Sequence, residues 1–366
     1  MTFSYKNGFY ALALVVLIVF VIWIARTLLV PLAFGLLFAL VLFPLVRKLQ
    51  STRLGLVGAI IISMTIVVVG VSGLFVFFST MLVSVADEFK NFQSKLVELG
   101  EDIIVFLNEK VPFISDLSPE MLTENLGEFF SNSGFSIVSG TISKTGTFLT
   151  LFLLTFLYTF LILLYHKNLT EASAHFVEKE RRPVFVGMLK KVQKVGQQYL
   201  TGMILLILVL GVLNSIGLLL IGLDYAIFFG FFAAVMAIIP YVGTTLGGLI
   251  PTFYAFMTHD NPWFALVVVA VFWFVQTLEG NVLSPYIVGS NLNLNALSAI
   301  IALIAGGLLW GLPGMVLALP FAAILKVFFD HYESTKPLAL LMADQSGGGK
   351  FAPIEKVKHW LSKMKQ

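Results

Sequence analysis

Eight runs of predominantly apolar residues, each at least 17 residues long, constrain this chain more than any other feature of its sequence. A helix that crosses a bilayer needs about 20 such residues. The runs are Phe9–Ala25, Leu28–Val46, Leu54–Val85, Phe148–Tyr165, Leu200–Leu223, Tyr225–Met257, Trp263–Val288 and Ala296–Phe329. We therefore predict an all-α polytopic integral membrane protein with about eight transmembrane helices.

Composition supports the same class of protein. Of the 366 residues, 58% are hydrophobic and 12% are charged, and the mean hydropathy is +0.95. A soluble domain carries about twice that share of charge. These figures exclude a soluble enzyme, a nucleic-acid-binding protein and a disordered chain. The net charge of +3 is too small to indicate nucleic acid as a partner, and the lipid bilayer is the expected one.

The distribution of charge predicts the orientation of the chain. Residues 166–199 contain seven Lys or Arg against three acids, and Arg47, Lys48 and Arg53 follow the second apolar run. Residues 86–147 contain ten acids against four lysines. Because loops rich in Lys and Arg stay in the cytoplasm, the basic segments are predicted to be cytoplasmic and the acidic insert to lie outside. Eight spans then leave both termini in the cytoplasm.

Five segments follow from these patterns. We expect three transmembrane helices in 1–85, an extracytoplasmic amphipathic helical insert in 86–147, a fourth transmembrane helix and a basic cytoplasmic loop in 148–199, a charge-poor core in 200–330, and a cytoplasmic tail in 331–366. The insert shows helical spacing of apolar residues over Asp87–Asn108 and a second short helix from Ser118 to Phe130. Beyond the flexible Gly347–Gly349, residues Phe351–Gln366 form a basic amphipathic pattern suited to an anionic leaflet, although a solvated tail is the simpler alternative.

One acid in the core stands at membrane depth. Thr201–Leu325 contains no Lys or Arg and three acids, of which Asp224 and Asp260 fall at the ends of apolar runs and Glu279 falls inside one. A charge at that depth costs about 2.5–3.5 kcal/mol on insertion scales and usually has a function. Gln276 lies three residues away on the same helical face, and Asn281 follows. We predict a proton- or cation-binding group here; pairing of Glu279 with a cation such as Arg26, or a protonated carboxyl bonded to a carbonyl, is the structural alternative.

Two apolar runs are too long for single spans and are interrupted by Gly and Pro. Tyr225–Met257 has 33 residues and Ala296–Phe329 has 34, or about 50 Å of helix against a hydrocarbon core of about 30 Å. Each is predicted to be either a re-entrant hairpin or one kinked helix, and such paired segments mark substrate sites in transporters. The breaking or hinge residues are Pro240, Gly243, Gly247, Gly248, Pro251, Gly306, Gly307, Gly311, Pro313, Gly314 and Pro320, with Gly280 and Pro285 loosening the helix after Glu279. Thr244 and Thr245 complete the candidate binding residues.

Signatures of enzymes are missing from the sequence. It contains no His-Glu-x-x-His pair, no Gly-x-Ser-x-Gly elbow, no Walker loop and no cysteine. We therefore expect no enzyme activity and no cofactor or metal. Transport without a nucleotide site must be passive or driven by a gradient, with H⁺ or Na⁺ as the coupling ion.

Three motifs in the second half resemble those of the autoinducer-2 exporter family of bacterial permeases. They are Ile239-Pro240-Tyr241-Val242-Gly243 with Gly247 and Pro251, Gln276-x-x-Glu279-Gly280-Asn281 leading to Pro285, and Gly306-Gly307-x-x-Trp310-Gly311-x-x-Gly314-Met315 ending at Pro320. The resemblance implies a multipass transporter of the bacterial inner membrane that forms homo-oligomers, with a pentamer as one form, and has a mobile C-terminal part. An elevator-like motion would fit the paired broken segments.

The first functional hypothesis is a proton- or cation-coupled secondary transporter that exports a small polar solute, such as a signal molecule of the autoinducer-2 type. The second is a Na⁺(Li⁺)/H⁺ antiporter that uses the same glutamate. The third is a channel or a structural membrane scaffold without a transport cycle.

Overall fold

The structure, a computed structural model, describes residues 5–51, 54–110, 149–239, 242–259, 261, 263–287 and 293–344. Within these ranges the chain is helical, and the one β-type pairing is an isolated bridge between Leu294 and Ala343. The all-α prediction is confirmed. The predicted helix Ser118–Phe130 and the tail Phe351–Gln366 lie outside the described residues.

The first half supplies four long helical segments and a short helix. They are α1 (Tyr5–Ile24), α2 (Arg26–Gln50), α3 (Leu56–Lys110), the helix Leu149–Leu164 and α5 (His166–His175). The last two are bent by 71° at Tyr165. The first helix of the predicted insert is not separate, because α3 continues without interruption past Val85 to Lys110.

The second half is built from a long helix and shorter ones that follow it. A 3₁₀ turn (Lys179–Arg181) leads into α6 (Arg182–Leu220), and the rest are α7 (Ala226–Met236), α8 (Val242–Thr258), α9 (Trp263–Leu278), a π-helical turn (Glu279–Leu283), α10 (Ser284–Ile287), α12 (Ala296–Trp310), α13 (Leu312–His331) and α14 (Lys336–Met342). Most of the predicted basic segment before Tyr199 is helical, in α5 and the first turns of α6.

Within the described residues, each predicted apolar run is largely helical. In the described residues five helical segments are long and apolar enough to cross a membrane, or six if the bent pair at Tyr165 counts as one span: α2, the first part of α3, α6, α9 with its π turn, and α13. The remaining apolar runs are met by shorter helices, including α1, α7 and α12. These counts rest on length and composition, and they agree with a multipass membrane protein.

Both long broken segments are helical hairpins rather than kinked helices. A β-carbon added to Gly247 of α8 would lie 2.8 Å from the Cα atom of Ala233 in α7, and one added to Gly243 would collide with the Met236 carbonyl. These pairs put residues of α7 and α8 opposite each other in antiparallel order about residues 237–242. Close contact between the helices depends on glycine there, because only glycine lacks the β-carbon that would hold them apart.

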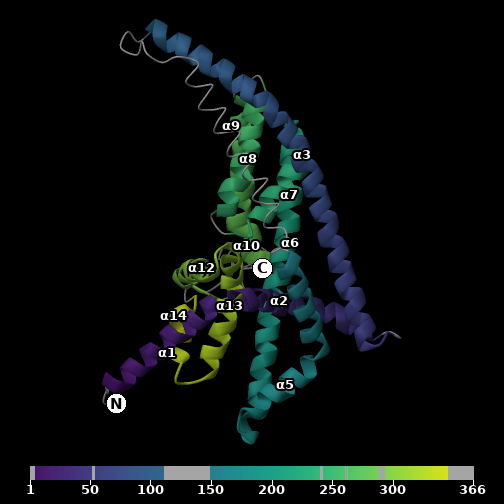
Figure 1. The fold of residues 1–366 in the computed structure, drawn as a ribbon, viewed down its shortest axis with the longest axis vertical. Helices are drawn as coiled ribbons and strands as arrows, with labels where there is room; N and C mark the ends of the chain where they lie inside the picture. The colour runs from purple at the N-terminus through teal and green to yellow at the C-terminus, as the bar shows by residue number, and fades with distance from the viewer. Residues whose placement is uncertain are drawn as a thin grey trace, which may run out of the picture.

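The second hairpin joins α12 to α13 in the same way. Gly306 faces Gly314, and a β-carbon on either would meet the backbone of the other. The chain turns at Gly311, whose φ of +66° glycine adopts readily but residues with a side chain rarely adopt. Figure 1 shows α7, α8 and α9 standing together beside the upper part of α6, with α12 and α13 below them.

Several predicted break points lie inside continuous helix. Pro251 is within α8, Pro320 is within α13, and Gly306 and Gly307 are within α12. The prediction that these residues interrupt their helices is wrong, and Pro313 sits in the first turn of α13, where a proline needs no hydrogen-bonded N–H. The rings of Pro251 and Pro320 are both fully buried, so packing offsets the hydrogen bond that each proline removes.

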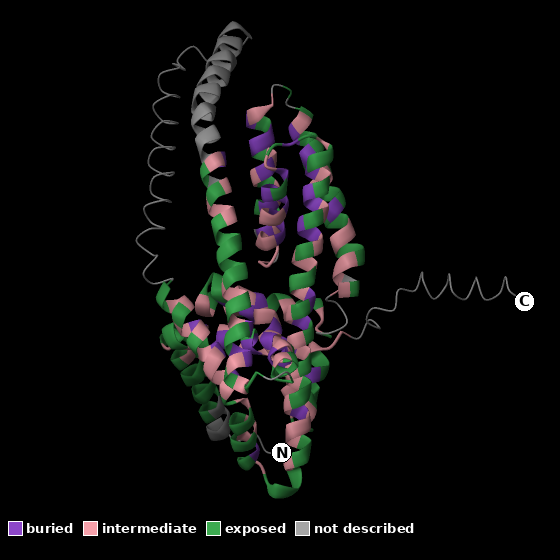
Figure 2. Cartoon of the chain, turned by 90° about the vertical axis from the view of Figure 1, so that its right-hand side faces the viewer, coloured by how far each residue is buried: buried purple, intermediate pink, exposed green. Residues whose placement is uncertain are grey.

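Buried side chains gather where the helices cross. Phe229, Tyr254 and Val268 join α7, α8 and α9 into one apolar cluster, and Leu37 and Leu317 join α2 to α13. Figure 2 shows buried residues along the facing sides of the upper helices and at the centre of the molecule, while the outward faces are exposed. Apolar outward faces are expected where lipid rather than water is the solvent.

Candidate functional site

The Glu279 carboxylate lies where α9 widens into the π-helical turn Glu279–Leu283. The sequence predicts a loosened helix around Gly280 and Pro285, and the structure accommodates it as one π turn followed by α10. π turns inside α-helices occur frequently at functional sites. The turn changes the register of the helix directly at the acidic residue.

Gln276 bonds directly to this acid. Its Nε2 atom donates to Oε2 of Glu279 at 2.7 Å, as the shared helical face predicts. Arg26, which the sequence offered as an alternative partner, lies over the Trp23 ring, with its guanidinium carbon 5.8 Å from the ring centroid. The carboxylate is therefore held by an amide and not by that cation.

A cavity of about 20 Å³ lies beside the carboxylate. Its walls come from α6, both arms of the α7–α8 hairpin, and α9; they are Leu210, Asn214, Ala233, Ala234, Ala237, Thr244, Phe272, Val275, Gln276 and Glu279. A cavity needs about 10–15 Å³ to hold one water molecule. The space next to Glu279 is therefore large enough for about one water molecule.

Asn214 is the functional candidate that sequence reasoning missed. It lies on α6 with 5% of its surface exposed, and its Oδ1 atom has no hydrogen-bond partner among the described residues. A buried carbonyl oxygen without a partner costs about 1–3 kcal/mol, so such a group calls for an explanation. In the sequence it is visible only as an amide side chain within the apolar run Ile204–Leu220. Because it is uncharged, the distribution of charge does not single it out.

The predicted binding residues divide into two groups. Thr244 of α8 meets Gln276 and Glu279, from α9 and its π turn, at the cavity. Thr245 is exposed and does not line it. Asn281 is exposed as well and does not line the cavity, and its Nδ2 atom donates to the Thr277 carbonyl at 2.8 Å.

The predicted hinge residues also fall into distinct roles. Gly243 and Gly247 bring the hairpin arms into contact, and a β-carbon added to Gly248 would lie 3.6 Å from the Phe272 ring of α9, an ordinary contact. An added β-carbon on Gly280 would meet open space. Pro240 lies outside the described residues, and Pro285 falls within α10.

The fold and this site define a multipass α-helical membrane protein in which a helical hairpin packs beside a carboxylate that lies on an apolar helix. Comparison with known proteins gives the family. A sequence profile described as AI-2E family transporter matches residues 12–334, and the chain belongs to that family. The family is one of bacterial membrane transporters, so membrane transport is the function that this membership supports.

Relatives carry transport names as well. The chain is 23% identical to the AI-2 transport protein TqsA of Escherichia coli (strain K12) over 91% of this chain and 94% of that protein, and 25% identical to the putative transport protein YhhT of the same strain over 90% and 92%. Similarity to the putative transport protein YrrI of Bacillus subtilis (strain 168) is 40% over 37% of each chain. That match therefore spans little more than a third of the YrrI sequence.

Proposed function

We propose that this protein is a secondary-active exporter of a small polar solute, coupled to protons through Glu279. The solute class follows the name of TqsA, an AI-2 transport protein, and autoinducer-2 is the first compound to test. Residues that this chain contributes to the coupling site are Asn214, Thr244, Gln276 and Glu279. The membrane would be the bacterial inner membrane, with both termini cytoplasmic.

The observation that carries the proposal is the unpartnered Oδ1 atom of Asn214 beside Glu279. An acceptor in that position can bind a proton donor, such as a protonated carboxyl or a water molecule that exchanges protons with it. Gln276 already donates to one carboxylate oxygen. Loading and release of one proton would therefore form and break a hydrogen bond between Asn214 of α6 and Glu279 beside α9.

The size of the cavity argues for a conformational cycle. About 20 Å³ accommodates a water molecule or an ion but no organic solute, and ligand pockets usually measure about 300–1,000 Å³. A solute would need the α7–α8 hairpin to withdraw from α6 and α9. We propose that this displacement of the α7–α8 hairpin is part of an elevator-like motion.

The test is solute flux in proteoliposomes under an imposed pH gradient. Glu279→Gln keeps the size and the hydrogen-bonding capacity of the side chain but removes its proton equilibrium, so proton-driven flux should fall to the level of protein-free vesicles. Asp224→Asn is the matched control, because it removes an exposed acid between α6 and α7 and should leave flux unchanged. Wild-type flux with unaltered dependence on pH in Glu279→Gln would remove this carboxyl from the mechanism.

A Na⁺(Li⁺)/H⁺ antiporter is the second candidate, and one observation favours it. The polar lining of the cavity offers amide, hydroxyl and carboxylate oxygens from Asn214, Thr244 and Glu279, which are the ligands that hard cations bind. Sodium or lithium uptake against a proton gradient without any organic solute would select this function. Flux that requires the solute would select the exporter.

The assembly is also open to direct measurement. We expect a homo-oligomer of this 40.3 kDa chain, a pentamer being one form, and native mass spectrometry of the detergent-extracted protein would count its subunits.

A further inference from the structure

A second and larger cavity lies at the opposite end of α6 from Glu279. Its volume is about 650 Å³, within the range of ligand pockets, and it is enclosed by α2, the bent pair Leu149–Leu164 and α5, the first turns of α6, and α13. None of its lining residues lines the cavity at Glu279. Gln193 and Asn214 are separated by about 30 Å along α6.

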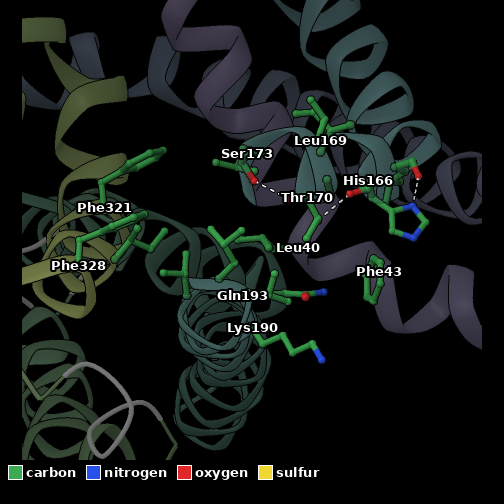
Figure 3. A pocket seen from close by; sticks show the side chains of 18 of the residues that line it. Leu40, Phe43, His166, Leu169, Thr170, Ser173, Lys190, Gln193, Phe321 and Phe328 are labelled. Carbon is green, nitrogen blue, oxygen red and sulfur yellow. Dashed lines mark hydrogen bonds between the residues drawn. The ribbon is translucent and has the colours of Figure 1, made fainter. Parts of the chain in front are cut away.

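The walls of this cavity are apolar over most of their surface. Leu40 and Phe43 of α2 face Phe321 and Phe328 of α13 across it, and Leu169 of α5 closes one side (Figure 3). Such a lining excludes a small polar solute as the natural occupant, since it would lose its hydrogen bonds to water. It suits a hydrocarbon chain.

The hydroxyl and imidazole groups in the lining are already engaged by the backbone. Thr170 Oγ1 donates to the His166 carbonyl at 2.8 Å, Ser173 Oγ donates to the Thr170 carbonyl at 2.9 Å, and His166 Nδ1 lies 2.7 Å from the Leu163 carbonyl oxygen (Figure 3). These side chains therefore bond to nearby backbone carbonyls and not to a ligand in the cavity. The groups left to address a ligand are Lys190 and Gln193 of α6.

Lys190 supplies the charge of the site. In the part of the chain that the structure describes, no carboxylate lies within ion-pair distance of its ammonium group, which is exposed at the edge of the cavity. Lys167, Lys191 and Lys194 belong to the same basic segment. An anion beside Lys190 would therefore meet a positive potential with no acid in contact to offset it.

A neighbouring aromatic residue indicates where the bilayer surface lies. Phe176 at the end of α5 is 94% exposed, and the cations Lys179 and Arg182 follow within six residues. An exposed aromatic ring among cations is suited to the headgroup region of a bilayer, where the ring meets lipid and the charges meet phosphate. Ser173, which lines the cavity, is only three residues before Phe176, so a lipid whose headgroup lies at that level can reach the cavity.

We propose that this cavity binds one acyl chain of an anionic phospholipid, with the phosphate beside Lys190 and the chain between α13 and α5. An occupied cavity would join α13 to α2, α5 and α6 through the lipid. The site is independent of the coupling site at Glu279, and its test does not use transport activity.

The first arm uses the wild-type protein and a phosphatidylglycerol that carries a diazirine in its acyl chain. After photolysis in nanodiscs, peptide mass spectrometry should find the label on residues that face the cavity, such as Leu169, Phe321 and Phe328. Labelling confined to outward-facing residues such as Val69 and Phe75 of α3 would overturn the proposal.

The second arm separates the headgroup from the chain. Lys190→Gln should lower the preference for phosphatidylglycerol over phosphatidylcholine, measured by native mass spectrometry, by about fivefold. Lys191→Gln is the matched control, because it removes the same charge from the next residue, which does not line the cavity. An equal loss in both variants would reduce the effect to general surface charge and overturn the assigned headgroup site.

The third arm fills the cavity. Ser173→Trp should reduce diazirine labelling at Phe328 at least about tenfold, since the indole would occupy the space of the chain. Ser173→Ala removes the hydroxyl but leaves the volume open, so it should label as the wild type does. Undiminished labelling in a folded Ser173→Trp protein would show that the chain binds elsewhere, and the wild-type arm decides the question if that variant does not fold.

Discussion

The carbonyl oxygen of Asn214 yields the sharpest prediction at the scale of single residues. Asn214→Leu removes an acceptor that has no partner, so the melting temperature should stay the same or rise, because the cost of burying that group, about 1–3 kcal/mol, disappears. Proton-coupled flux should fall by about tenfold to a hundredfold if the oxygen serves the coupling site. Differential scanning fluorimetry and vesicle flux on the same preparation measure both quantities.

Asn214→Ser is the companion variant, because it restores an oxygen at a smaller volume. It should recover part of the flux that Asn214→Leu loses. A purely structural amide would behave otherwise: both variants would lower stability, and flux would follow the amount of folded protein.

Sequence reasoning reached Glu279 and Gln276 through charge and helical spacing, and the bond between them confirms that local geometry. Thr244 entered as a neighbour of the hairpin glycines, and it does line the cavity. Asn281 and Thr245 do not line the cavity. The π turn sets the direction of Asn281, and the orientation of α8 about its own axis sets that of Thr245. Asn214 could be noticed as an amide in an apolar run, but its place beside Glu279 could not be predicted, since it depends on the packing of α6 against α9.

At the scale of helices, the hairpin contacts predict how substitutions will act. Gly243→Ala and Gly314→Ala each place a methyl group against the backbone of the facing arm, so each should lower the free energy of unfolding by about 1–3 kcal/mol. Thermal unfolding in detergent measures the change. Gly73→Ala in α3 is the control, because its added carbon meets open space and helix propensity favours alanine; equal destabilisation by all three would refute the hairpin contacts.

The existence of the helices was predictable, but the places where they break were predictable only in part: the break at Gly311 is confirmed, and those at Gly306, Pro251 and Pro320 are not. Gly and Pro lower the stability of a helix, but tertiary packing decides whether the helix ends. Pro251 and Pro320 are buried inside continuous helices, whereas Gly311 turns the chain by adopting a positive φ. A sequence records the local preference and not the packing that overrides it.

At the scale of the whole molecule, the contact between α2 and α13 tests the elevator-like motion. Ala33 and Leu317 are buried in the same cluster, and the chain contains no cysteine that could interfere. A disulfide in Ala33→Cys/Leu317→Cys would join the N-terminal helices to the second hairpin. Flux should stop on oxidation and return on reduction with dithiothreitol, and full flux in the oxidised protein would exclude relative movement at this contact.

A hydrogen bond from a side chain to a backbone carbonyl also joins the two halves of the molecule. Trp310 Nε1 of α12 donates to the Ile22 carbonyl of α1 at 3.0 Å, although the two residues are 288 positions apart. If the second half moves relative to the first, this bond and the α2–α13 cluster must therefore break or rearrange. The sequence placed these segments in separate parts, and it contained no signal for their contact.

The continuity of α3 has a mechanical consequence. Its 55 residues make a helix about 80 Å long along its axis, well beyond the hydrocarbon thickness of about 30 Å. Figure 1 shows that this helix is curved and unbroken. With no interruption where the sequence predicted a domain boundary, a tilt of about 10° at one end displaces the other by on the order of 10 Å. A small change in the tilt of α3 within the bilayer would therefore produce a large displacement of its C-terminal end, which fluorescence distance measurements could detect.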